Sequence, residues 1–289
     1  MICFLFAVHA LALTAQAAPV PPVEPPASVQ TQALDRTLNR IYDWDLTTAH
    51  GLLGDYTKQY PDDPLGWSVT AGAWLFGEFD RLHILEMDFF ADDDAIVDKR
   101  TLRADPGART RIFDALDHAR ARAGARLALD GADRDALLAM CMASNTVADY
   151  TAFVERKQWR GAMLERQAVV YTNRLLALAP PAYDAYYTAG TLEYIVGSLP
   201  FFIRWFVHYE GVSGSKARGV EQLELVAKRG RYYGPFARVL LTLVALREKR
   251  LEEAERRIAD LAREFPENGV FRKELARIQA ELRRTAKKR

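Results

Sequence analysis

The sequence has few residues that form cross-links or bind metals. Its 289 residues include two cysteines and five histidines. Cys3 lies in an N-terminal stretch that we expect to be cleaved, so Cys141 remains alone and no intramolecular disulfide can form. Cys141 lies in the apolar stretch LLAMCMAS, which is typical of a small buried side chain rather than a nucleophile. Because no histidine pairs with another at metal-ligand spacing and no nucleophile motif occurs, we predict no metal, no cofactor and no catalytic residue.

The chain also lacks a large net charge. Lysine and arginine total 39, and aspartate and glutamate total 38, so the formal charge is +1 and gives no electrostatic reason to expect nucleic acid as a partner. The charge is uneven, because residues 272–289 hold eight basic and two acidic side chains. Such a tail is either a solvated helix end or a surface for acidic lipids or partners. We therefore consider peripheral membrane contact through this tail as an alternative to a solvated helix end.

Charged residues are absent from the first eighteen positions, MICFLFAVHALALTAQAA. This apolar run ends in Ala-Gln-Ala at positions 15–17, which fits the cleavage rule for a secretory signal, although no basic residue precedes it. It is too short for a comfortable membrane span. Residues 18–28 then hold five prolines, which favour an extended spacer over a helix. We predict a signal peptide at 1–17, a proline-rich linker at 18–30, and an exported bacterial protein that is periplasmic or secreted.

Strand signals are lacking as well, since no alternating run is bounded by hairpin turns. Apolar residues recur instead at three- and four-residue spacing, as at Leu34, Leu38 and Ile41. Asp45 and Asp63 are typical helix caps at the start of the next two segments. We predict an all-α domain at 31–289. Its later helices are expected in two segments between 133 and 180, with a break near ERKQW, and at 183–197, 199–209, 215–229, 235–248, 251–264 and 269–287.

An alanine followed twelve positions later by a proline occurs in three of these segments. The three pairs are Ala49 and Pro61, Ala168 and Pro180, and Ala254 and Pro266. A small alanine allows two helices to approach closely, and a proline ends the second helix of a hairpin. The spacing therefore indicates repeated helix hairpins.

This pattern resembles the second helix of the tetratricopeptide repeat, and LLTLVALREKRLEEAERRIADLAREFPEN resembles one full unit. Leu241 and Ala245 would lie on its first helix, and Ala254, Ile258 and Leu261 on its second. The block from Ala136 to Pro266, with DYTAFVERKQW and APPAYDAYYTAGTLEYIVGSLP, is similar to a group of exported bacterial tetratricopeptide-like proteins related to the eukaryotic inclusion-body-clearance type. The resemblance implies an α-α superhelix of stacked antiparallel hairpins with a binding role. Within it, 31–130 is a divergent first half, 131–268 the clearer repeat block, and 269–289 a basic C-terminal helix.

The stretch from Gly197 to Gly219 combines an aromatic segment with a glycine- and serine-rich loop. The segment LPFFIRWFVHY is interpreted as a core helix, with a ligand groove or a membrane-surface helix as alternatives. The loop GVSGSKARG lacks the spacing of a phosphate-binding loop. It is interpreted as a turn with Ser213 or Ser215 capping the next helix, and an anion beside Lys216 and Arg218 is the alternative.

Repeat proteins of this kind bind partners along a concave groove lined by their first helices. The candidate groove residues are Tyr187, Tyr194, Arg204, Trp205, His208 and Lys216. For the tyrosines, packing between neighbouring repeats with their hydroxyls at the rim is the more ordinary interpretation. We therefore expect a non-catalytic scaffold that binds a protein or peptide. The alternatives are a protein with a deep apolar cavity beside Trp205 for a lipid or glycan, and an all-α enzyme. An enzyme would need a pair of buried carboxylates with strongly shifted pKa values in a cleft.

Overall fold

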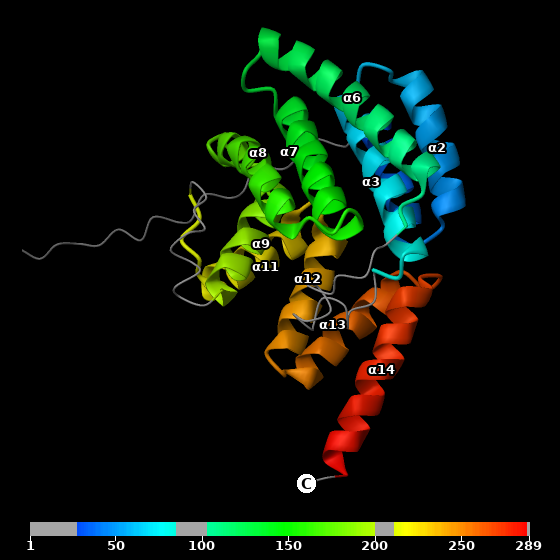
Figure 1. Ribbon diagram of the computed structural model, residues 1–289, viewed down its shortest axis with the longest axis vertical. Coiled ribbons are helices and arrows are strands. Elements are labelled where there is room, and N and C mark those ends of the chain that lie inside the picture. Colours follow the sequence, from blue (N-terminus) through cyan, green and yellow to red (C-terminus); the bar gives the residue numbers. More distant parts are fainter. Residues whose placement is uncertain (1–27, 85–102, 200–210, 288–289) are drawn as a thin grey trace, which may run out of the picture.

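The computed structural model describes residues 28–84, 103–199 and 211–287, and within these ranges it is all helical (Figure 1). The prediction of an all-α fold is confirmed. The helices are α1 (Val29–Tyr42), α2 (Leu46–Gln59), α3 (Pro64–Arg81), α6 (Pro106–Leu129), α7 (Arg134–Asp149), a π-helical turn η1 (Tyr150–Val154), α8 (Gln158–Leu176), α9 (Ala185–Ser198), α11 (Lys216–Arg229), α12 (Gly234–Arg247), α13 (Leu251–Glu264) and α14 (Gly269–Ala286).

Consecutive helices pack as hairpins: α1 with α2, α3 with α6, α7 with α8, α9 with α11, and α12 with α13. Each hairpin also contacts the next, and α14 packs on α13. In Figure 1 the row runs from α2 and α3 through α6 and α7 to α8, α9 and α11, and then returns through α12 to α13. The chain is therefore a curved superhelix of stacked hairpins.

The alanines of the three alanine-proline pairs are buried in helix hairpins. Ala49, Ala168 and Ala254 are each 0% exposed, so the second helices α2, α8 and α13 approach their neighbours closely. α2 and α13 end two residues before Pro61 and Pro266. A proline at that position cannot continue the helix, so the chain turns back into the next hairpin.

The helix α7 lies in the middle of the row and is buried on most sides. Together with η1, the segment Arg134–Val154 is long and apolar enough to cross a membrane, but 72% of its apolar window is buried inside the fold. Its apolarity thus serves the protein core. Cys141 on this helix is 1% exposed, as predicted for a buried side chain, and burial raises the pKa of its thiol to about 11.

The superhelix is tight enough for its first helix to contact its last hairpins. The Tyr42 hydroxyl at the end of α1 donates to the carbonyl of Tyr232 at 2.5 Å. Asn268 Nδ2 donates to the carbonyl of Tyr42 at 2.7 Å, and Asp35 forms an ion pair with Arg231 at 2.7 Å. These bonds join residues about 190–226 positions apart. The concave side is therefore partly closed.

Candidate binding site

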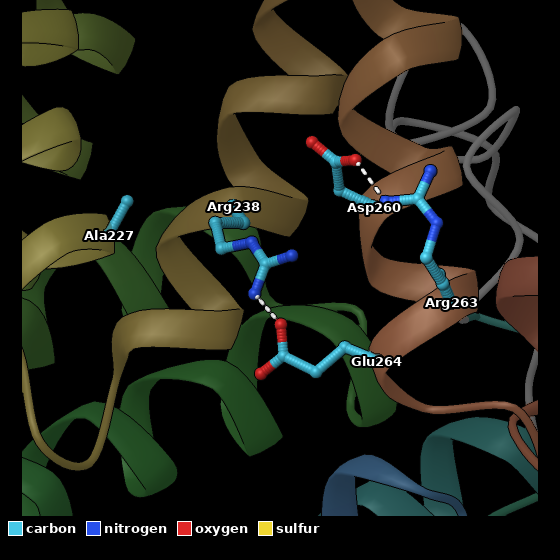
Figure 2. A pocket seen from close by; sticks show the side chains of 5 residues that line it. All are labelled: Ala227, Arg238, Asp260, Arg263 and Glu264. Carbon is cyan, nitrogen blue, oxygen red and sulfur yellow. Dashed lines mark hydrogen bonds and ion pairs between the residues drawn. The ribbon is translucent and has the colours of Figure 1, made fainter.

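Two hollows are the candidate sites, and the larger lies on the outside between α11, α12 and α13. It is an open depression of about 590 Å³. Figure 2 shows that its charged side chains point toward one another: Arg238 pairs with Glu264, and Arg263 pairs with Asp260 at 2.9 Å. Because these charges neutralise each other in contact with water, the depression has little to offer a ligand.

The second hollow lies inside the superhelix and has a volume of about 80 Å³. Its lining residues come from α1, α3, α7, α9 and α12 and from the turn just before α12. These helices are the first members of the five hairpins. The second helices contribute no lining residue within the described part of the chain. The inner cavity therefore lies on the side of the superhelix that the first helices form, which is the side where a binding groove is expected.

Aromatic rings form much of the cavity wall. Tyr187 on α9 stacks on Tyr233 with ring centroids 4.3 Å apart, and Phe76 on α3 stacks on Phe236 at 4.8 Å. Tyr42 on α1 meets Phe236 at 5.8 Å. Rings from four hairpins therefore form part of the wall of this small cavity.

A carboxyl group lies at the polar end of this cavity, which is the part lined by Asn145 and Asp149 of α7. Asp149, the last residue of α7, lines it, and Glu165 of α8 lies close enough for the two charges to interact. Both side chains are half-buried. Removal from water raises the pKa of Asp149 to about 7. Removal from water and the neighbouring Asp149 raise the pKa of Glu165 to about 8. Neither carboxyl has a hydrogen-bond or ion-pair partner among the described residues.

The backbone changes geometry beside these acids. The π-helical turn η1 begins at Tyr150, directly after Asp149. The helix is then interrupted at residues 155–157, before α8 starts. The predicted break near ERKQW is confirmed. Widened turns of this kind recur at functional sites, because they shift side chains out of the regular helical register.

The predicted site residues have different fates. Tyr187 lines the inner cavity. Tyr194 is 7% exposed and lies outside the cavity lining, with Lys216 Nζ 5.6 Å from its ring centroid. Lys216 itself is exposed at the start of α11. The aromatic segment with Arg204, Trp205 and His208 lies outside the described residues.

The loop before α11 forms the predicted turn. Gly211 and Gly214 have φ values of 80° and 74°, and Ser215 caps α11. The place of an anion is taken by the protein's own Glu193, which accepts hydrogen bonds from the backbone N–H groups of Ser213 and Ser215 at 2.9 and 2.7 Å. Burial alone would raise the pKa of Glu193, but these bonds lower it below its usual value.

The sequence analysis missed Asn145, Asp149 and Glu165, although a signal was present. Cys141, Asn145 and Asp149 are spaced by four residues, so the two polar side chains share the buried face of α7. Glu165 lies between Gly161 and Ala168 on the buried stripe of α8. Polar residues on an otherwise buried stripe are the signal that marks them.

No group of three histidine, cysteine, aspartate or glutamate side chains within the described ranges is arranged to hold a metal ion. Comparison of the chain with protein-family models, with curated proteins and with solved structures gives no match, so the cavity is interpreted from its own geometry.

Proposed function

We propose that the chain is a non-catalytic scaffold, similar to tetratricopeptide proteins, which binds a protein or peptide through the inner cavity of its superhelix. The observation that carries this proposal is the origin of the cavity wall, since first helices from all five hairpins meet there. Ligand pockets usually measure roughly 300–1,000 Å³. A cavity of about 80 Å³ favours one side chain of a partner over a whole lipid or glycan.

Filling the cavity tests this function. Gly72 lines the cavity, and a Cβ atom added there has no neighbour within 4 Å. The Gly72→Met variant should therefore fold and fill the space. Peptides selected from a random display library on the full chain should bind this variant at least ten times more weakly.

Gly51→Met is the matched control, because Gly51 lies exposed on α2 and also has open space at its Cβ. It should bind the selected peptides as the unchanged protein does. Equal binding by the Gly72→Met variant would mean that the partner does not use the inner cavity.

An all-α enzyme is the second candidate, and one observation favours it. Asp149 and Glu165 form a pair of carboxyls with raised pKa values beside a cavity, which suits general acid–base chemistry. The small volume argues against a substrate lying between them. Turnover of a small substrate that disappears in the Asp149→Asn variant would favour the enzyme over the scaffold.

We also propose an exported location for the chain. Residues 1–27 lie outside the described residues, so the support is the sequence pattern alone. N-terminal sequencing of the protein recovered from the periplasm or medium should begin at Ala18.

The helix α14 extends away from the body in Figure 1. We propose that its basic residues make peripheral contact with acidic lipid. Binding to anionic vesicles checks it.

A further inference from the structure

The polar end of the inner cavity offers hydrogen-bond acceptors that the protein itself leaves unused. Asn145 is 8% exposed and lines the cavity. Its Nδ2 atom donates to Thr188 Oγ1 at 2.9 Å. The Tyr233 side chain lies beside the same amide, but the Oδ1 atom accepts no hydrogen bond of normal geometry. A buried amide oxygen without a donor is costly, so it marks a place that a ligand donor completes.

The groups that face this end are acids or neutral side chains. Glu165 on α8 interacts with Asp149 on α7, and both act on Tyr187 of α9. Tyr42, Tyr232 and Tyr233 also line the cavity. Glu165 and Asp184 both act on Cys141. No lysine or arginine among the described residues acts on either carboxyl strongly enough to count among the causes of its pKa.

We propose that this end of the cavity binds a primary ammonium group, which is the tip of a lysine side chain or of an alkylamine. An ammonium has three donors and no acceptor. Asp149 and Asn145 Oδ1 line the cavity and provide acceptors, and Glu165 adds a second negative charge beside Asp149. The stacked rings of Tyr187 and Tyr233 are suited to hold a cation nearby.

The volume of the cavity fits the same group. A water molecule occupies about 30 Å³ in the liquid. A cavity of about 80 Å³ therefore accommodates two or three non-hydrogen atoms at the end of a ligand's chain. This size suits an ammonium with its last methylene groups. The inference rests on the proposed function, because it specifies which partner side chain enters the cavity.

The affinity of the cavity for the ammonium group should increase with pH. Removal from water raises the pKa of both Asp149 and Glu165, to about 7 and about 8, so both are largely protonated at pH 6 and ionised at pH 9. An alkylammonium keeps its proton up to about pH 10. The affinity for the ammonium should therefore rise at least tenfold between pH 6 and pH 9.

Calorimetric titration of the full chain with n-butylammonium chloride tests the site, with 1-butanol as the uncharged probe. The unchanged protein should bind the ammonium at pH 9 and not the alcohol. Asp149→Asn and Glu165→Gln should each weaken binding at least tenfold, whereas Asp114→Asn, an exposed acid on α6, should leave it unchanged. Circular dichroism confirms that each variant is folded.

The outcomes separate this inference from the proposed function. No butylammonium binding at pH 9, or equal binding by the Asp149 and Glu165 variants, overturns the ammonium site. Selected peptides that lack lysine, yet lose affinity for the Gly72→Met variant, support the scaffold and overturn the ammonium site. Butylammonium that binds while lysine peptides do not supports the site for a free amine and overturns the peptide scaffold.

Discussion

Three first helices end in the same backbone turn, with a residue in the left-handed region that favours glycine. Trp44, His83 and Lys249 have φ values of 66°, 56° and 58° after α1, α3 and α12. At each end, the next residue donates its N–H back across the turn, as Arg250 does to the carbonyl of Ala245 at 2.8 Å. This is the Schellman motif, which reverses the chain into the second helix. A non-glycine residue there stores backbone strain.

Relieving that strain at Lys249 should stabilise the protein. Lys249 is exposed, so its side chain contributes little to packing. Lys249→Gly should raise the free energy of unfolding by about 0.5–1 kcal/mol, measured by urea denaturation. Lys249→Ala keeps the Cβ atom and should give no such gain. If both variants gained the same free energy of unfolding, the cause would be the loss of the lysine charge instead of the relief of strain.

The acids of the inner cavity should make stability depend on pH. Their pKa values are raised on folding, to about 7 for Asp149 and about 8 for Glu165, from ordinary values of 3.8 and 4.5. The folded state therefore holds more protons than the unfolded state between about pH 4 and pH 8. Stability is fully present below this window and falls as the pH rises through it.

Removing one of these charges should reverse the loss. At pH 8.5 Asp149→Asn should be about 1–2 kcal/mol more stable than the unchanged protein, less than the full pKa shift implies because the side chain keeps some contact with water. Near pH 4, the lower edge of that window, the difference between the two should be close to zero. Urea denaturation at both pH values measures the difference, and a constant difference would show that ionisation is not its cause.

At the scale of elements, α9 and α11 pack backbone against backbone. A Cβ atom added to Gly219 would lie 2.7 Å from the carbonyl oxygen of Gly190, and one added to Gly190 would lie 3.0 Å from that of Gly219. The two backbones touch because neither residue has a side chain. This contact places Glu193 beside the loop that it holds before α11.

Widening this contact should destabilise the fold. Gly219→Val should lower the free energy of unfolding by about 2–3 kcal/mol, since the backbone atoms in its way cannot rotate aside. Gly124→Ala in α6 is the control, because its Cβ has no neighbour within 4 Å, and a helical alanine there should stabilise by about 0.5–1 kcal/mol. Thermal and urea denaturation compare the two. Destabilisation by both would point to a general intolerance of glycine replacement.

The helix boundaries were largely predictable from the sequence. The predicted segments at 215–229, 235–248, 251–264 and 269–287 agree with α11 to α14 to within one residue at each end. The reason is local: Ser215 and Asn268 cap their helices with their own side chains, and apolar spacing marks the buried face.

At the scale of the whole molecule, the bonds between α1 and the last hairpins decide how open the concave side is. The Tyr42 ring packs on Phe265, while its hydroxyl reaches the carbonyl of Tyr232. No local pattern in the sequence of α1 predicts that Tyr42 contacts these residues. Asp184 supports the same region, because it accepts hydrogen bonds from the N–H groups of Tyr232 and Tyr233 at 2.9 and 2.7 Å.

Tyr42→Phe should loosen this closure while keeping the ring. It should cost about 1–2 kcal/mol, since it leaves a buried carbonyl without its donor. Hydrogen exchange should speed up in α1 and at 231–233 but not in α7. Tyr60→Phe, where the hydroxyl makes no hydrogen bond among the described residues, should have little effect. Unchanged exchange in α1 would mean that the hydroxyl contributes nothing to closure.

The sequence by itself determined the all-helical class, the helix boundaries and the alanine positions at the hairpin contacts, because caps and periodicity act over a few residues. Only the tertiary structure decided that, among the described residues, the first helices of the five hairpins enclose a cavity as small as about 80 Å³. It also brought Glu165 of α8 beside Asp149 of α7, which lines that cavity. Such juxtapositions depend on how far each hairpin turns relative to the next, and that angle is set by packing across the whole superhelix.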